Sequence, residues 1–151
     1  MAAELATVHA SAVLIGSHAL LITGPSASGK SALAFALIEC ARTGRLPFAR
    51  LVGDDRLCVE VVHGRLLIRP ATVLAGLIEV RGLGIRRLPY EPVAVVGGVV
   101  ELAAGDANRL PGTESMEAVI AGVRLPRLAV AAGVDPLPLV LAWQQTANAI
   151  I

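Results

Sequence analysis

The sequence predicts an α/β domain built on a mixed β-sheet, with a second half that is rich in strands. Two features indicate this class. An apolar run at residues 19–23, a glycine-rich turn and an alanine- and leucine-rich run at residues 32–39 form the pattern of a buried strand, a loop and a helix. After this helix, short runs of valine, leucine and isoleucine are separated by glycine and proline, which is typical of strands and turns. A regularly alternating βαβ kinase is therefore not expected.

The composition fits one globular domain. The chain has 151 residues, of which 55% are hydrophobic and only 3% aromatic, so small aliphatic side chains must build the core. No uninterrupted apolar stretch reaches the roughly 18 residues of a membrane-spanning helix. A net charge of +1 gives no indication of a nucleic-acid partner. The first residues lack the basic start of a secretion signal, and the two cysteines match no metal or redox spacing, so we expect a cytoplasmic protein.

The remaining elements follow from short patterns. A strand over residues 7–15 and a turn at residues 17–18 precede the strand that leads into the loop, and the helix is expected to end near Ala41. Gly97 and Gly98 divide a valine-rich run, which predicts two separate strands. Further strands are expected at residues 50–52, 57–62, 65–69, 93–96, 99–102, 119–123, 127–131 and 137–142, and a short helix at residues 70–77.

The loop between the strand and the helix carries the most specific motif. Lys30, the only lysine of the chain, would reach the β- and γ-phosphates of a nucleotide, and the Ser31 hydroxyl would bind Mg²⁺. Backbone N–H groups would wrap the polyphosphate at the positive end of the helix. An ordinary glycine-rich turn is the alternative. The pattern G-x-x-x-x-G-K-[ST] is matched by Gly24, Pro25, Ser26, Ala27, Ser28, Gly29, Lys30 and Ser31.

Two groups of charged residues could complete a site. Asp54 and Asp55 follow an apolar strand, where carboxylates hold a metal ion or act as a base, although Gly-Asp-Asp-Arg also suits a solvated turn. Glu79 and Arg81 are expected on one strand, facing the same side; a simple ion pair is the alternative. The nearby Gly82 would permit close backbone approach.

These residues lead to a resemblance. The stretch 79–85, Glu-Val-Arg-Gly-Leu-Gly-Ile, resembles the signature of the HPr(Ser) kinase/phosphorylase family. That family phosphorylates a serine of HPr, the phosphocarrier of the bacterial sugar phosphotransferase system, and is related to the nucleotide-binding core of phosphoenolpyruvate carboxykinases. His9, the 24–31 loop, the Asp54–Asp55 pair and Asn108-Arg109-Leu110 stand in the family's order. The resemblance covers residues from about 8 to 142 and implies a carboxykinase-type mixed sheet in a single catalytic domain over residues 1–151.

The resemblance also implies roles. The loop and Lys30 would bind ATP, Ser31 and Glu79 would hold Mg²⁺, and Asp55 would support the metal. Asp54 would take the proton from the substrate serine. The transferring phosphoryl group would be stabilised by Arg81 and Arg109, with His9 nearby. A structural, partly buried histidine is the alternative for His9.

One departure from the family concerns the C-terminal part. The family has a basic loop there that is linked to dephosphorylation. In residues 130–136 of this chain the only charged residue is the acid Asp135, and no Lys or Arg follows Arg127. We therefore expect an ATP-dependent serine kinase of HPr, serving regulation of carbon metabolism, with weak or absent phosphorylase activity. The family's hexamer suggests a homo-oligomer. A small-molecule P-loop kinase and a non-catalytic nucleotide sensor remain alternatives.

Overall fold

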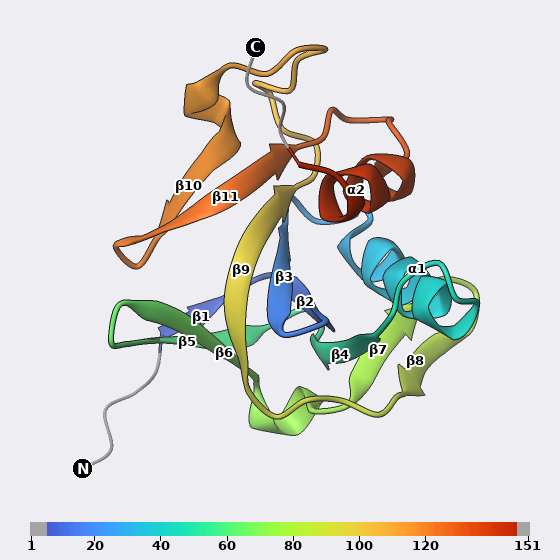
Figure 1. Cartoon of the computed structure of the whole chain (residues 1–151). Coiled ribbons are helices and arrows are strands. Elements are labelled where there is room, and N and C mark those ends of the chain that lie inside the picture. Colours follow the sequence, from blue (N-terminus) through green and yellow to red (C-terminus); the bar gives the residue numbers. More distant parts are fainter. Residues whose placement is uncertain (1–5, 148–151) are drawn as a thin grey trace.

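A computed structural model describes residues 6–147, in which a curled mixed sheet is accompanied by few helices (Figure 1). In chain order the elements are β1 Ala6–Val8, β2 Ser11–Ile15, β3 His18–Thr23, α1 Lys30–Arg42, β4 Ala49–Gly53, β5 Leu57–Val62, β6 Arg65–Pro70, the 3₁₀ turn η1 Thr72–Leu74, β7 Leu77–Val80, β8 Gly84–Arg87, β9 Ala94–Glu101, the 3₁₀ turn η2 Thr113–Met116, β10 Glu117–Ile120, β11 Val123–Ala129 and α2 Pro136–Gln145.

The sheet topology brings three loops to one edge. Within the described residues the main path runs β1-β5-β6-β9-β3-β2-β4, β11 joins β9 and carries β10, and β7 pairs separately with β8. Strand β9 is parallel to both β3 and β11, with Thr23 opposite Glu101 and Glu101 opposite Ala129. Because the carboxyl ends of parallel strands meet at the same edge, the segments after β3, β9 and β11 leave the sheet together.

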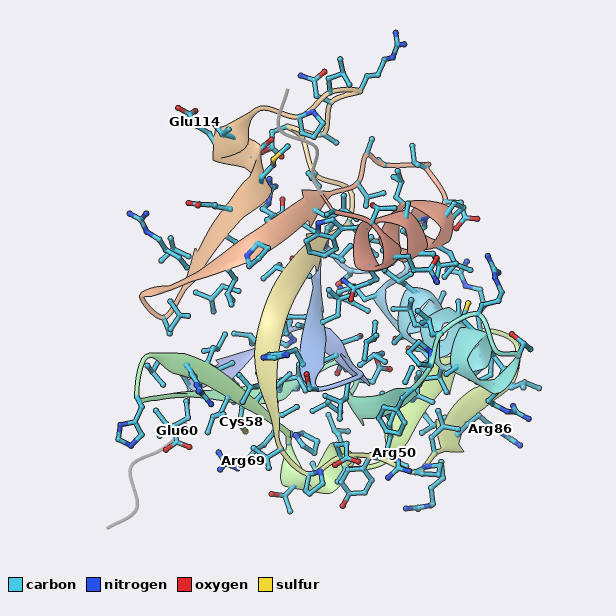
Figure 2. The ribbon with its side chains drawn as sticks, in the orientation of Figure 1. Arg50, Cys58, Glu60, Arg69, Arg86 and Glu114 are labelled. Carbon is cyan, nitrogen blue, oxygen red and sulfur yellow. The ribbon has the colours of Figure 1, made fainter. Side chains whose placement is uncertain are left out.

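Both faces of the sheet are covered by apolar side chains. Alternate residues of β3 point to opposite sides: Ile22 joins the core under α1 and α2, and Leu21 joins the core enclosed by the curl of β5, β6 and β11. Helices α1 and α2 lie on the same side of the sheet (Figure 1). One half-buried ion pair, Arg69–Glu60, crosses from β6 to β5 (Figure 2). None of the helices within residues 6–147 is long and apolar enough to cross a membrane.

Most predicted elements are confirmed, with small shifts at their ends. The helix begins at Lys30 and runs to Arg42, and the hairpin turn at His63 and Gly64 joins β5 to β6. The strand expected over residues 7–15 is two strands, β1 and β2, separated by a bend at His9. Residues 70–77 contain only the short 3₁₀ turn η1.

Three predictions in the second half are wrong. The strand expected over residues 119–123 spans the turn at residues 121–122, which joins β10 to β11. Residues 137–142 lie in α2, because Asp135 caps the helix by accepting a hydrogen bond from the Leu137 N–H at 3.1 Å and Pro136 occupies its first turn. The Gly97–Gly98 pair is not a turn but lies inside the single strand β9. A register shift between β3 and β9 brings His18 against Gly97, where an added Cβ would stand 2.7 Å from the His18 Cβ. These glycines therefore permit close packing.

We expect Gly97→Ala to lower the free energy of unfolding by about 1–3 kcal/mol, because β3 and β9 must separate to admit the new methyl group. Urea unfolding measures the change. Gly105→Ala is the matched control, since no atom of the described residues 6–147 lies within 4 Å of its added Cβ. Equal stability of the two variants would contradict the packing role of Gly97.

Candidate active site

The 24–31 loop connects the end of the central strand β3 to the start of α1. Gly24 has φ +146° and Gly29 has φ +98°, both in the region that favours glycine, and a Cβ on Gly24 would stand 2.9 Å from the Leu102 carbonyl oxygen. Gly29 is the N-cap residue of α1, so no side chain caps the helix. The uncapped N–H groups and the helix dipole suit an anion.

Lys30 is folded back over this loop. Its Nζ donates hydrogen bonds to the carbonyl oxygens of Gly24 at 2.9 Å and Pro25 at 3.0 Å. Its half-buried side chain therefore lies along the loop.

Asp54 is the centre of the site. It directly follows β4, is only 5% exposed, and is held by residues from three other elements. Its Oδ1 accepts hydrogen bonds from the Ser11 hydroxyl of β2 at 2.5 Å and the Ser31 hydroxyl of α1 at 2.8 Å. Its Oδ2 lies 2.8 Å from the same Ser31 oxygen and accepts a 3.1 Å bond from the Glu79 N–H of β7. These donors compensate the burial of the carboxylate.

The other two acids differ in their placement. Glu79 lies on β7 with an exposed side chain, beside Asp54 through its own backbone N–H. Asp55 is exposed and has φ +70°, a left-handed conformation that aspartate adopts more readily than most residues, in the bend between β4 and β5. No group of three His, Cys, Asp or Glu side chains within residues 6–147 could hold a metal by itself. A magnesium ion would therefore need the Ser31 hydroxyl and phosphate oxygens as well.

Three further residues that the sequence predicts at the site, His9, Arg81 and Arg109, are all exposed. His9 is exposed at the bend two residues before Ser11, so a buried structural role does not apply. Arg81 is exposed in the turn after β7; it does not share a strand face with Glu79, because β7 ends at Val80 and the chain turns through Gly82. Within the described part, no hydrogen bond or ion pair connects Arg109 to this cluster; it lies in the exposed segment between β9 and η2.

An arginine that the motifs do not indicate organises this segment. The Arg127 side chain, only 10% exposed, is bound to Glu101 at the end of β9 and to both oxygens of Asp106, each at 2.8 Å. It also donates to the Ser115 carbonyl oxygen at 2.9 Å. Arg127 holds the pKa of the Asp106 carboxyl below its usual value, and the two acids raise the pKa of the Arg127 guanidinium. The segment that carries Arg109 is thus tied to β11 and β9.

A cavity of about 260 Å³ opens beside the loop, where the segments after β3, β9 and β11 converge. The Ser28 hydroxyl, which lines it, is buried without a hydrogen-bond partner within the described residues. Asp135, expected near this place, caps α2 and does not line the cavity. The lining carries no charge and consists of Pro25, Ser26, Ala27, Ser28, Leu102, Ala103, Val130, Ala131, Ala132, Gly133, Val134 and Pro136.

Sequence motifs identify some residues of the Asp54 cluster but not all of them. Motifs indicate Asp54, Ser31 and Glu79. Ser11 appears in the sequence only as a polar residue in the apolar run 10–15, and nothing there indicates that it faces Asp54. These features define a class of protein. It is a mixed-sheet domain whose candidate site lies at a glycine-rich loop between a central strand and a helix, with a buried carboxylate beside the loop.

Comparisons with known proteins narrow this class. The model of the HPr Serine kinase C-terminal domain matches residues 1–89, more than half of the chain. The chain therefore belongs to this family. The HPr kinase/phosphorylase of Clostridium tetani is 40% identical over 70 residues, which cover 46% of this chain and 21% of that protein. The HPr kinase/phosphorylase of Streptococcus thermophilus is 39% identical over 84 residues, 55% of this chain and 25% of that protein. The matched part is thus a quarter or less of these curated relatives.

A solved structure extends the likeness over most of the chain. The Hpr(Ser) kinase/phosphatase from Coxiella burnetii has a TM-score of 0.71 and 26% identity, and the match covers 90% of this chain and 91% of that chain. The shared architecture is the curled mixed sheet with few helices.

The Arg127–Asp106 pair gives a pH-dependent prediction. Because the pKa of Asp106 is lowered from 3.8 on folding, its contribution to stability is complete above that pH and is lost as the pH falls below it. We expect Asp106→Asn to be less stable than the parent protein at pH 7, and the difference to shrink towards about pH 3. Urea unfolding across this range measures it.

Glu114→Gln is the control for this series. Glu114 is an exposed acid of the same segment, and within residues 6–147 it forms no ion pair (Figure 2). Its substitution should leave stability unchanged at every pH. If Asp106→Asn remained less stable than the parent protein by the same amount in acid, the ion pair would not be the source of the difference.

Proposed function

We propose that this domain is an ATP-dependent protein kinase that phosphorylates a serine of an HPr-type phosphocarrier and thereby regulates the phosphotransferase system and carbon metabolism. The observation that carries the proposal is the Asp54 cluster: a buried carboxylate hydrogen-bonded to Ser31, at the start of an uncapped helix that follows the 24–31 loop. Membership of the HPr Serine kinase C-terminal domain family supports the substrate. A carboxykinase-type core and one catalytic domain over residues 1–151 belong to the same proposal.

The donor side would be formed by the loop. The amides at the start of α1 would bind the phosphates of ATP, and Lys30 would exchange one or both of its carbonyl partners for a phosphate oxygen. The unpartnered Ser28 hydroxyl and the uncharged cavity beside it suit the less polar part of a nucleotide. Ser31, Glu79 and Asp55 would hold Mg²⁺, because hydroxyl, carboxylate and phosphate oxygens are its preferred ligands. The ion would neutralise charge on the phosphates.

The acceptor side would be formed around Asp54. Its carboxylate would take the proton of the substrate serine, and the hydrogen bonds from Ser11 and the Glu79 N–H fix its orientation for that transfer. Arg81 would stabilise charge on the transferring group from the turn beyond β7, and His9 would lie nearby. Arg109 would join Arg81 from the exposed segment between β9 and η2, although within the described residues it makes no hydrogen bond or ion pair with the cluster.

The reverse reaction is proposed to be weak. Attack of inorganic phosphate on a phosphoserine brings two anions together, and their repulsion must be offset by cations. The segment after β11 offers none, because residues 130–136 contain no Lys or Arg and include the acid Asp135. A homo-oligomer and a cytoplasmic location remain predictions.

Transfer from labelled ATP to HPr tests the function. We expect label on a serine of HPr, and Lys30→Ala should lower the rate by about 10²–10³-fold, because a positioned cation on the phosphates is lost. Arg65→Ala, at an exposed position near the β5–β6 turn, is the control and should transfer normally. Label on a small molecule instead would indicate a metabolite kinase, and nucleotide binding without transfer would indicate a sensor.

Asp54 and Asp55 are distinguished by paired variants. Asp54→Asn should keep nucleotide binding and lower kcat by about 10²–10⁴-fold, because an amide accepts no proton. Asp55→Asn should raise the Mg²⁺ concentration needed for half-maximal rate and keep kcat at saturating Mg²⁺. Urea unfolding of both variants controls for folding, since the amide introduced by Asp54→Asn would leave one hydrogen bond of the cluster unmade. The opposite pattern would exchange the two roles.

A further inference from the structure

The β7–β8 hairpin presents exposed apolar side chains beside the site. Its first strand packs on α1, with Ile78 only 1% exposed and Val80 against the same core. Its second strand is exposed along its whole length. Leu83 in the turn is 68% exposed and Ile85 on β8 is 64% exposed, although both are large aliphatic residues. Within residues 6–147 no strand pairs with this outer strand on the side away from β7.

The strand register places Ile85 on the same side of the hairpin as Glu79. Glu79 is the direct cross-strand partner of Ile85, and cross-strand partners project to the same face. Ile78 and its partner Arg86 belong to the opposite face, which meets α1. The Glu79 N–H is bonded to Asp54, so the buried carboxylate lies along the edge of β7 away from β8, and Ile85 is separated from it by β7 but shares the face of the Glu79 side chain.

The hairpin also carries positive charge. Arg81, Arg86 and Arg87 all lie on it, and no ion pair within the described residues joins any of them to an acid. Arg86 points outward at the periphery of the molecule (Figure 2). Glu79 is the only acid of the two strands and their turn.

We propose that Leu83, Ile85 and Arg87 form a docking surface for the folded protein that carries the acceptor serine. This inference rests on the proposed kinase function and adds where the protein substrate binds. Serine has a short side chain and Asp54 is only 5% exposed, so the hydroxyl reaches the carboxylate only when the surface around the serine lies against the neighbouring hairpin. The occupant is therefore a protein whose serine stands beside apolar side chains, with carboxylates placed toward the arginines.

The test compares a whole protein with a peptide. The substrates are HPr and a short peptide that copies the segment around its acceptor serine, because the peptide is too small to cover the hairpin. In Leu83→Ser/Ile85→Thr the KM for HPr should rise at least about tenfold, while the KM for ATP and the rate with the peptide stay unchanged. Arg87→Glu should also raise the KM for HPr relative to the parent protein at low salt, and added salt should reduce that increase.

Val119→Thr is the matched control. Val119 lies on β10, is 65% exposed and undergoes the same change of chemistry away from the site, so its KM for HPr should equal that of the parent protein. Urea unfolding verifies that all variants are folded.

Three results would overturn the inference. A KM for HPr that is unchanged in the folded double variant excludes docking on this hairpin. A change of oligomeric state in sedimentation, with no change in KM, would assign the surface to a second copy of the chain. Failure of the parent protein to phosphorylate HPr would overturn the kinase function itself, and this outcome is recognised before any variant is compared.

Discussion

The site end of this domain depends on one buried carboxylate. Asp54 is almost inaccessible to solvent, and a charge in such a place is tolerated only when donors surround it. Those donors come from β2, α1 and β7, while Asp54 itself follows β4. Four segments that are distant in sequence are therefore required to meet at one point. The same contacts stabilise the packing of α1 and β7 on the sheet and arrange the oxygen atoms of the candidate active site.

A second constraint is the direction of three strands. Since β3, β9 and β11 are parallel, the segments that follow them leave from one edge and enclose the cavity beside the 24–31 loop. The Arg127 ion pairs then fix the longest of these segments to the ends of β9 and β11. The sheet supplies the frame from which these segments extend.

Local sequence patterns predict much of this structure, but they do not predict the contacts between side chains that depend on how the strands pair. The 24–31 loop, α1 and the β5–β6 hairpin follow from spacing and turn residues, because their causes lie within a few positions. The Gly97–Gly98 pair suggests a turn in the sequence, but the structural reason for each glycine lies in another element: an added Cβ would meet His18 of β3 at Gly97 and Trp143 of α2 at Gly98. The apolar run 137–142 has no period that separates a short helix from a strand. Within the site, motifs indicate Asp54, Ser31 and Glu79, whereas the bond from Ser11 depends on how β2 faces β4.

The conformation of Lys30 has a consequence for ligand affinity. A lysine side chain free in solution loses about 2 kcal/mol of rotamer entropy when it is fixed on a ligand. Here two carbonyl oxygens of the loop already order the ammonium group, so most of that loss accompanies folding rather than binding. Under the proposed function, an arriving phosphate would replace neutral acceptors by a charged one, which forms the stronger hydrogen bond. The loop is thus preorganised by its own cation, and selectivity for anions would follow from a change of hydrogen-bond partner rather than from ordering of a flexible side chain.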